Sequence, residues 1–279
     1  MIVLINKATK LSDTFLKLPK EYIAKIKFGI ETDTFDIEGK IISQKNIDGL
    51  NINDIDIVLD KFKGLVKQIP PMYSALKHNG KPLYKIARMG RSVERKPRDV
   101  KISEIEVKGF DGHILTIKIC CSSGTYIRTL ADDIGKALGT GAVLYGLKRS
   151  NIGGFCLEGS VKVKQISDIE KINTLIENKS IIISIEELLR NNPSIFIKTG
   201  EEKAIINGKR ISPGMIDFKK TDTHGLDNLN KRSSQNFKSM LLIKDFTGSV
   251  IAVHCIIKKI KFDDTGSFEQ EFTKSIVIF

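Results

Sequence analysis

The chain has 279 residues, a net charge of +12 and a hydrophobic content of 41%, which suffices for one large domain with a small one, or for two domains. It has no apolar run of about eighteen residues and no secretory signal pattern at its start, so we expect neither a membrane span nor a signal peptide. The excess of 45 Lys and Arg residues over 33 Asp and Glu residues favours a polyanionic partner.

Strands and helices are predicted in mixed order over the first half of the chain. Alternating apolar and polar residues predict the strands, and apolar residues at helical spacing predict the helices. The expected elements are strands over 22–30, 41–42, 100–109 and 114–121, helices over 52–66, 83–89 and 126–138, an ordered loop over 68–80 and an apolar segment over 142–147. Asn53 and Thr125 are the candidate N-caps of the first and last of these helices. This order is an α+β pattern with hairpins, and not a repeating βαβ array.

A domain boundary is expected near 185–195. Ser184 and Glu187 form a capping box for a last helix over 185–190, and Asn191-Asn192-Pro193 ends that helix. The pattern after this boundary predicts a small β-rich domain. Its strands begin at 195, 240, 250 and 275, with a helical turn over 201–206 and a polar, mobile loop over 221–239. We therefore expect one domain over 1–190 and a second over 194–279.

The four cysteines and four histidines are scattered without the spacing of metal ligands, so we expect no metal site. Cys120 and Cys121 are adjacent in a predicted strand and point to opposite faces, which argues against a bridge between them. Reduced thiols are typical of a cytoplasmic protein, which is the location we expect.

A change of period over 121–135 marks the candidate ligand site. A strand ends at Cys121 and a helix begins near Tyr126, so Tyr126 and Arg128 lie at a junction of the kind that often carries ligand-facing side chains. A ring and a guanidinium two residues apart suit a planar, anionic ligand, because the ring stacks and the fork pairs with an acid. Taken alone, this run is explained better by an ordinary helix N-terminus with a surface arginine.

Basic residues gather between Lys77 and Lys101. This stretch holds nine basic and two acidic residues, with Tyr84 inside it and Tyr73 just before it. Phosphate contacts with Lys and Arg supply most of the affinity for nucleic acid, and aromatic rings stack on splayed bases. A solvated charged helix and loop is the alternative interpretation. We prefer RNA contact because the run coincides with the resemblance described next.

Several motifs occur in the order and spacing of one family. They are K-A-T-K-L-S at 7–12, G-x-x-T-D-T at 29–34, P-P-M-Y-S-A-L-K at 70–77, G-K-x-L-Y at 80–84, A-R-x-G at 87–90, S-x-G-T-Y-I-R-x-L-x-x-D-I-G at 122–135 and G-x-G-A-x-L-x-x-L-x-R at 139–149. Together they resemble the bacterial tRNA pseudouridine-55 synthase (TruB) family, strongly over about residues 1–165 and weakly in the tail.

The resemblance implies a pseudouridine-synthase-like mixed or antiparallel sheet with flanking helices, followed by a PUA-like β-rich RNA-binding domain. It implies an isomerase that converts uridine 55 in the T arm of tRNA to pseudouridine, as a monomer and without a cofactor. Arg128 matches the arginine that orients the catalytic aspartate, and Tyr22 matches the tyrosine that packs on the flipped base and takes part in proton transfer. Tyr22, Tyr126 and Leu147 match positions that line the uracil pocket. The matching RNA-binding positions are Lys77, Lys81, Arg88 and Arg91.

The family's nucleophilic aspartate lies in a G-H-x-G-x-L-D-P segment upstream of the K-A-T-K match, and this segment does not occur in the 279 residues. The resemblance therefore predicts a chain truncated at its N-terminus relative to the family, through a misassigned start codon, a gene truncation or expression of a fragment. Arg128 would then be a partly buried cation without its partner. Capping and helix-dipole roles explain the acids near the matched motifs, so none is named as nucleophile. These acids are Asp33, Asp36, Asp132 and Asp133.

Three hypotheses follow. The chain belongs to a tRNA uridine isomerase, or it is a catalytically inactive tRNA-binding protein, or it is a general RNA-binding protein whose motifs are remnants. An in-frame G-H-x-G-x-L-D-P in the DNA ahead of Met1 would establish the first hypothesis, and stop codons there would exclude it. Binding of tRNA and of unrelated RNA at matched salt separates the other two, because nonspecific affinity is largely electrostatic.

Overall fold

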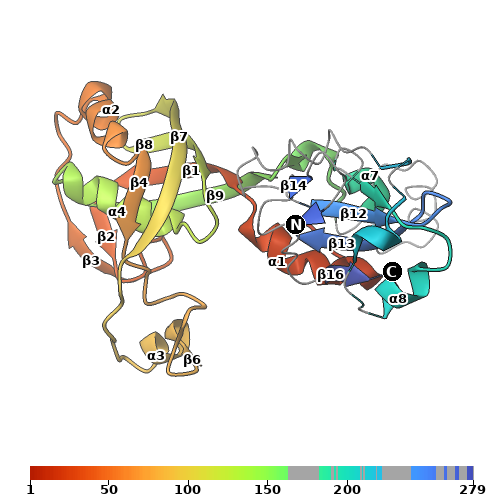
Figure 1. Ribbon diagram of the computed structural model, residues 1–279. Coiled ribbons are helices and arrows are strands. Elements are labelled where there is room, and N and C mark those ends of the chain that lie inside the picture. Colours follow the sequence, from red (N-terminus) through yellow and green to blue (C-terminus); the bar gives the residue numbers. More distant parts are fainter. Residues whose placement is uncertain are drawn as a thin grey trace. The chain divides into compact units, whose positions relative to one another are not determined.

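The computed structural model describes residues 1–162, 182–189, 192, 194–207, 209, 211–217, 219–221, 240–255, 261–262, 268–269 and 275–278 (Figure 1). The chain forms two compact units, of which one is Pro19–Leu157 and the other joins Met1–Leu18 to Glu158–Phe279. This division differs from the expected boundary near 190, because the start of the chain belongs to the same unit as its end. The catalytic and RNA-binding labels of the expected domains stay a prediction.

The unit Pro19–Leu157 is built on a six-stranded sheet in the order β10-β9-β1-β8-β7-β4. All its strand pairs are antiparallel, which confirms the expected α+β class. The strands are β1 (Lys20–Phe28), β4 (Gly64–Gln68), β7 (Arg98–Phe110), β8 (Ile114–Cys121), β9 (Ala142–Ile152) and β10 (Phe155–Cys156). Two hairpins are added by β2 (Ile30–Thr32) with β3 (Ile41–Gln44), and by β5 (Lys77–His78) with β6 (Lys81–Pro82).

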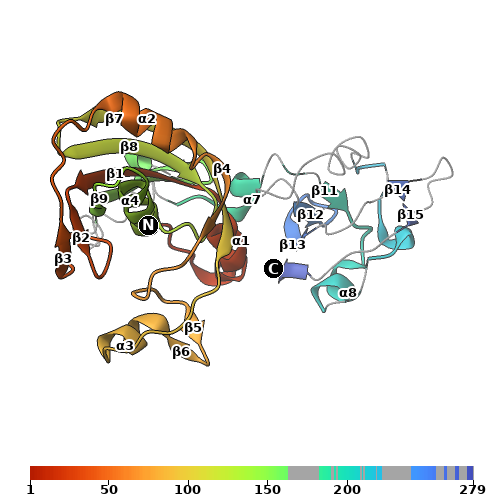
Figure 2. The same cartoon turned by 90° about the vertical axis from the view of Figure 1, so that its left-hand side faces the viewer.

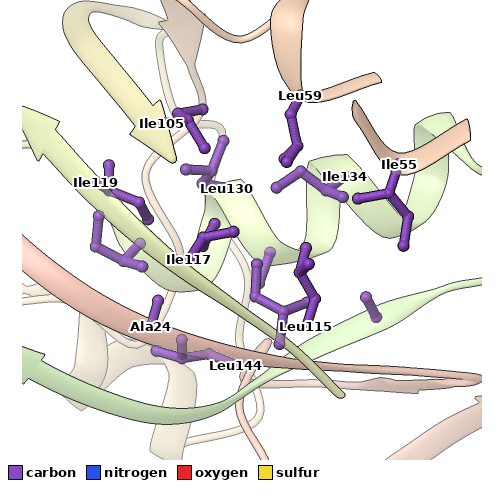
Figure 3. Packing of buried hydrophobic residues seen from close by; sticks show 14 of the residues in the cluster. Ala24, Ile55, Leu59, Ile105, Leu115, Ile117, Ile119, Leu130, Ile134 and Leu144 are labelled. Carbon is purple, nitrogen blue, oxygen red and sulfur yellow. The ribbon is translucent and has the colours of Figure 1, made fainter. Parts of the chain in front are cut away.

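The core of this unit lies between the sheet and two helices, α2 (Ile52–Asp60) and α4 (Ile127–Ala137). Ala24 and Ile26 on β1 are fully buried, as the alternating pattern predicts. Figure 3 shows Ile55 and Leu59 of α2 and Ile134 of α4 among strand side chains. The face that carries these helices is therefore the buried face of the sheet.

The helix expected over 52–66 is shorter than its apolar spacing suggested. It ends at Asp60, and Gly64, the first residue of β4, has a positive φ of 94° that breaks the helical path. Val66 pairs with Val100 of β7, so sheet pairing overrides the helical pattern there. The N-cap is Asn51 and not Asn53, because the Asn51 side chain accepts hydrogen bonds from the backbone N–H groups of Asn53 and Asp54.

The long helix expected over 126–138 is α4, and Gly139 with a φ of 75° follows its end. Thr125 is not its N-cap, since the Thr125 hydroxyl donates to the Ser122 carbonyl and Tyr126 occupies the cap position. The apolar segment expected over 142–147 is the first part of β9, which continues to Ile152 and pairs with β1. Gly135 lies against Ala142, where a Cβ atom would overlap the backbone of the strand.

Residues 69–97, called the arm from here on, connect β4 to β7 and extend away from the sheet in both views (Figures 1 and 2). The arm contains β5, β6 and the helix α3 (Leu83–Arg88). Gln68 and Arg98 are opposite each other in the β4–β7 ladder, so the arm leaves and returns at one paired position. Backbone bonds from Leu83 to Leu76 and from Tyr84 to Ser74 hold the arm together.

The second unit contains a four-stranded sheet in the order β11-β12-β13-β16, with β11 parallel to β12 and the other pairs antiparallel. Its strands are β11 (Ser194–Phe196), β12 (Met240–Lys244), β13 (Val250–Cys255) and β16 (Ser275–Ile278), with a separate pair of β14 (Lys261–Phe262) and β15 (Phe268–Glu269). Its helices are η1 (Asn6–Leu11), α1 (Ser12–Lys17), α7 (Ile185–Leu189) and α8 (Glu202–Ile206), and short 3-10 turns are η2 (Leu157–Gly159) and η3 (Pro213–Met215).

The start of the chain packs into this β-rich unit. Leu11 is fully buried in a cluster with Leu189 and Leu242. The Ser184 hydroxyl accepts a hydrogen bond from the Glu187 N–H, which confirms the expected cap of α7. The loop expected over 221–239 lies outside the described residues except for Thr221. No helix in the described ranges is long and apolar enough to cross a membrane.

Candidate functional site

The junction between β8 and α4 presents Tyr126 and Arg128 at the first turn of the helix. Both side chains are partly exposed, and the Arg128 side chain keeps 33% of its surface accessible. A buried glutamine, Gln68, holds the junction from the end of β4. Its amide donates to the Tyr126 carbonyl at 3.1 Å, and its carbonyl accepts from the Tyr126 N–H at 3.0 Å. The junction is thus fixed on its backbone while its functional side chains remain accessible.

Arg128 forms an ion pair with Asp36, with 3.1 Å between Nη1 and Oδ2. The expectation that Arg128 lacks an acidic partner is therefore wrong. The other carboxylate oxygen of Asp36 accepts from the Thr34 hydroxyl at 2.7 Å and from the Glu38 N–H at 3.3 Å. Donors on both oxygens hold the carboxylate in place, and the carboxylate in turn orients the guanidinium.

The loop that carries Asp36 is fastened to β9. The Leu144 N–H donates to the Phe35 carbonyl, and the Ile37 N–H donates to the Leu144 carbonyl, both at 3.0 Å. The Thr32 hydroxyl donates to the Asp36 carbonyl at 2.7 Å. Phe35 has a positive φ of 64°, an uncommon conformation for a residue with a side chain, and Lys136 lies over its ring. The carboxylate position is therefore set by backbone contacts on both sides.

Tyr22 and Leu147 lie on neighbouring strands of the sheet, β1 and β9. The register places Tyr22 opposite Arg149 and Ala24 opposite Leu147, so these four side chains share the face that carries α4. Tyr22 packs against the core, whereas 47% of Leu147 is exposed. An exposed leucine next to a half-buried tyrosine provides an apolar wall that a planar base can contact.

Arg149 lies opposite Tyr22 in the β1–β9 ladder and acts on the Tyr22 hydroxyl. Burial raises the pKa of Tyr22, the Cys121 thiol adds to this rise, and the Arg149 contact opposes it. The hydroxyl is therefore protonated at neutral pH and available as a hydrogen-bond donor.

Asp132 and Asp133, considered above as alternative acids, lie within α4. Asp132 is 4% exposed and pairs with Lys136 at 2.6 Å. Burial raises the pKa of both carboxyls, and for Asp133, beside the charge of Asp132, it reaches about 6. The ion pair with Lys136 gives Asp132 a structural role within α4.

The arm carries the predicted RNA-binding residues as an exposed basic surface. Lys77, Lys81, Arg88 and Arg91 are all exposed. Arg88 lies over the Tyr84 ring, with its guanidinium carbon 5.6 Å from the ring centroid. Arg95 differs from the rest of the run, because it is partly buried and donates to the Pro70 carbonyl at 3.1 Å. Arg95 therefore braces the base of the arm.

The structure adds residues that sequence reasoning missed. Asp36 was considered but not paired with Arg128, and neither Gln68 nor Arg149 was singled out. Two sequence features could have identified these positions. Arg149 is the last residue of the motif at 139–149, and Gln68 is a polar residue at the start of the proline-containing loop. A separate pocket of about 410 Å³ lies between α2 and the end of α4 and contains none of the predicted site residues. Within the described ranges, no group of three or more His, Cys, Asp or Glu residues could hold a metal ion.

The fold matches that of chains in two solved complexes. One is a crystal structure of a Cbf5-Nop10-Gar1 complex, with a TM-score of 0.63 and 20% identity over 98% of this chain and 71% of that chain. The other is the archaeal box H/ACA sRNP Nop10-Cbf5 complex, with a TM-score of 0.61 and 17% identity over 98% and 71% of the two chains. The chain therefore shares its mixed α+β architecture with these two solved chains.

Sequence comparison identifies the family within this class. Residues 1–127 match the family described as TruB family pseudouridylate synthase (N terminal domain), and 128–190 match the tRNA pseudouridylate synthase B C-terminal domain. The chain is 45% identical over 202 residues to tRNA pseudouridine synthase B of Francisella philomiragia subsp. philomiragia, covering 72% of this chain and 65% of that protein. It is 46% identical over 204 residues to tRNA pseudouridine synthase B of Francisella tularensis subsp. novicida, covering 71% and 68%. The chain belongs to the TruB family, and the match spans about two thirds of these relatives' length.

Proposed function

We propose that this protein is a tRNA pseudouridine synthase that isomerises uridine 55 in the T arm of tRNA. The observation that carries the proposal is the Arg128–Asp36 ion pair at the first turn of α4, because it holds a guanidinium in fixed orientation on the face that also presents Tyr22 and Leu147. The relatives named tRNA pseudouridine synthase B support the same reaction. A tRNA substrate places the protein in the cytoplasm.

The reaction breaks the N1–C1′ bond of the uridine, rotates the base and joins C5 to C1′, with loss of the proton from C5 and gain of a proton at N1. The base must first leave its stack, because the reacting atoms are hidden in folded RNA. A carboxylate acts as nucleophile, and the separated base must be shielded from water. The resemblance assigns this carboxylate to the G-H-x-G-x-L-D-P segment, which the 279 residues do not contain. Asp36 is not assigned this role, because donors already occupy both of its oxygens.

The residues of the pocket then have separate tasks. Tyr22 packs on the extruded base, and its protonated hydroxyl takes part in proton transfer. Tyr126 and Leu147 line the uracil pocket. Arg128 orients the nucleophilic carboxylate through its guanidinium fork, and Asp36 orients Arg128 from the other side.

The arm binds the RNA backbone in this proposal. The exposed cations Lys77, Lys81, Arg88 and Arg91 face phosphates, and the stacked Arg88–Tyr84 pair offers a flat surface to a base. The β-rich unit serves as a PUA-like RNA-binding domain, and a monomer suffices to bind one T arm.

Tritium release tests the proposal directly. A tRNA labelled with tritium at C5 of its uridines loses label when C5 bonds to the ribose. In a protein that carries the G-H-x-G-x-L-D-P segment ahead of residue 1, we expect release from a tRNA with uridine 55 and none above background from the same tRNA with cytidine at that position. Equal release from both RNAs would contradict the assigned target position.

A second candidate function is selective tRNA binding without turnover, which is favoured by the exposed cations of the arm and the Arg88–Tyr84 pair, since these features serve binding alone. Binding of the T-arm stem-loop is then compared with binding of an unrelated hairpin of equal length at the same salt. Selective binding without tritium release would establish this candidate. Equal binding of both RNAs without release would exclude both functions.

A further inference from the structure

Gln68 occupies an unusual position for a polar side chain. The residue is 3% exposed. Both of its side-chain hydrogen bonds go to the backbone of one residue, Tyr126, which is far away in the sequence. A glutamine amide is both donor and acceptor, so it binds the N–H and C=O of one residue as a neighbouring strand would. A side chain without both functions would leave a polar group of the junction unpaired in a buried setting.

Gln68 is also the residue directly before the arm. Gln68 is the last residue of β4, its Cα partner Arg98 is the first residue of β7, and the arm lies between them. The Arg95 contact with the Pro70 carbonyl closes the base of the arm just beyond Gln68. A displacement of the arm therefore reaches Gln68 and Arg98 before any other part of the sheet.

A second contact joins the same two regions. The Ser122 N–H donates to the Lys101 carbonyl at 2.8 Å, and the Lys101 N–H donates to the Ser122 hydroxyl at 2.9 Å. This contact extends the β7–β8 ladder toward Tyr126. The arm base and the junction are thus connected through both strands that carry the arm.

We propose that Gln68 is a positioning residue that couples the arm to the Tyr126–Arg128 junction, so that RNA held by the arm stabilises the pocket geometry. The inference rests on the proposed function for its substrate, a T-arm RNA. Gln68 itself contacts no RNA in this mechanism, because it is buried and both of its amide groups are engaged. Its effect reaches Arg128 through the backbone at the start of α4.

Two variants remove the coupling in different ways. Gln68→Met keeps the length of the side chain and deletes donor and acceptor together. Gln68→Glu keeps an acceptor for the Tyr126 N–H and places a carboxylate against the Tyr126 carbonyl, which repels it. Ser103→Ala is the matched control, because the Ser103 hydroxyl also donates to a backbone carbonyl between β7 and β8, that of Cys120, but away from the junction.

The first measurement separates binding from base capture. A T-arm stem-loop with a fluorescent pyrimidine in place of uridine 55 gives the dissociation constant by titration and base extrusion by the emission change at saturation. We expect both Gln68 variants to bind within about twofold of the wild type, because the arm cations remain, and to lose most of the emission change. Ser103→Ala should retain both values. A full emission change in both variants would overturn the inference.

The second measurement does not depend on base extrusion. Amide hydrogen exchange over residues 126–130 is compared with and without an unmodified T-arm stem-loop, and a thermal melt confirms that each variant is folded. We expect RNA to slow exchange there in the wild type and in Ser103→Ala but not in folded Gln68→Met. If the RNA probe shows no emission change with the wild-type protein, the proposed function fails. The hydrogen-exchange measurement alone then tests whether Gln68 couples the arm to the junction. Equal RNA-dependent protection in wild type and Gln68→Met would overturn it.

Discussion

The guanidinium of Arg128 and the carboxylate of Asp36 are 3.1 Å apart, although they come from a helix and a loop that are distant in sequence. The pair is partly exposed, with 33% and 24% of the two side chains accessible. A pair of this kind contributes little to folding stability, about 1 kcal/mol or less. Its geometry, with Asp36 fixed by further donors, is instead suited to orienting Arg128 for the reaction.

Replacing Asp36 with Asn should therefore impair turnover more than binding. The amide keeps the size of the side chain but removes the charge that holds the guanidinium. We expect tritium release to slow by at least about tenfold, because misorientation of a reacting group is costly, while T-arm affinity and melting temperature change little. Asp33→Asn, in the same loop, is the control. A parallel loss of affinity and rate in Asp36→Asn would contradict a purely orienting role.

The Tyr22 hydroxyl should matter for the reaction rather than for RNA affinity. Tyr22→Phe keeps the ring against the core and removes the hydroxyl on which Arg149 acts. We expect slower tritium release by about a hundredfold, the low end of the range for loss of a proton-transfer group, and an unchanged dissociation constant. Tyr145→Phe, at an exposed tyrosine on β9, should match the wild type. Normal turnover in Tyr22→Phe would remove the hydroxyl from the mechanism.

The exposed cations of the arm should set the salt dependence of RNA binding. Removing one phosphate contact lowers the slope of log affinity against log salt by about one. We expect this change for Arg91→Ala and for Lys81→Ala, together with weaker binding at low salt. Lys25→Ala removes an exposed cation from β1 and should leave the slope unchanged. An unaltered slope in both arm variants would place the RNA elsewhere.

The N-cap of α2 distinguishes two neighbouring asparagines. Asn51→Ala removes the acceptor for two backbone N–H groups at the start of the helix. We expect a loss of about 1 kcal/mol in unfolding free energy, measured by urea denaturation at constant pH. Asn53→Ala should have little effect or a slight benefit, since alanine is the better helix former. The reverse order of the two effects would show that the cap lies at Asn53.

Burial of Asp133 should make stability depend on pH. The pKa of this carboxyl is raised from 3.8 to about 6 in the folded protein, so the folded state binds the proton more tightly than the unfolded state. Its contribution to stability is therefore present at low pH and is lost as the pH rises from 3.8 to about 6. Asp133→Asn should melt higher than the wild type at pH 7, and the difference should shrink toward pH 4. The exposed Asp56→Asn provides the control.

The sequence predicted the strands and α4 because their patterns report burial against a single face. Ala24, Ile26 and Ile134 are fully buried where alternation and helical spacing place them. The end of α2 was not predictable in the same way, because Val66 satisfies a helical pattern and a strand pattern equally. Pairing of β4 with β7 decides between them, and that contact is tertiary.

The site was predictable only in part for a similar reason. Motifs identified Arg128, Tyr22, Tyr126 and Leu147 by resemblance, and the structure describes all four without testing their roles. The partner of Arg128 depends on a loop held by Leu144, and the support of Tyr126 depends on the end of β4. Contacts between segments far apart in sequence leave no periodic pattern, so single-sequence reasoning does not find them.

At Gly135, α4 lies directly against β9. The backbone of Ala142 occupies the place where a methyl group would stand, so even an alanine at position 135 would push the helix away from the strand. Arg128 moves with the helix and Leu147 with the strand, so the distance between these two side chains would grow. The spacing of the candidate site is thus set by a position whose side chain is a single hydrogen atom.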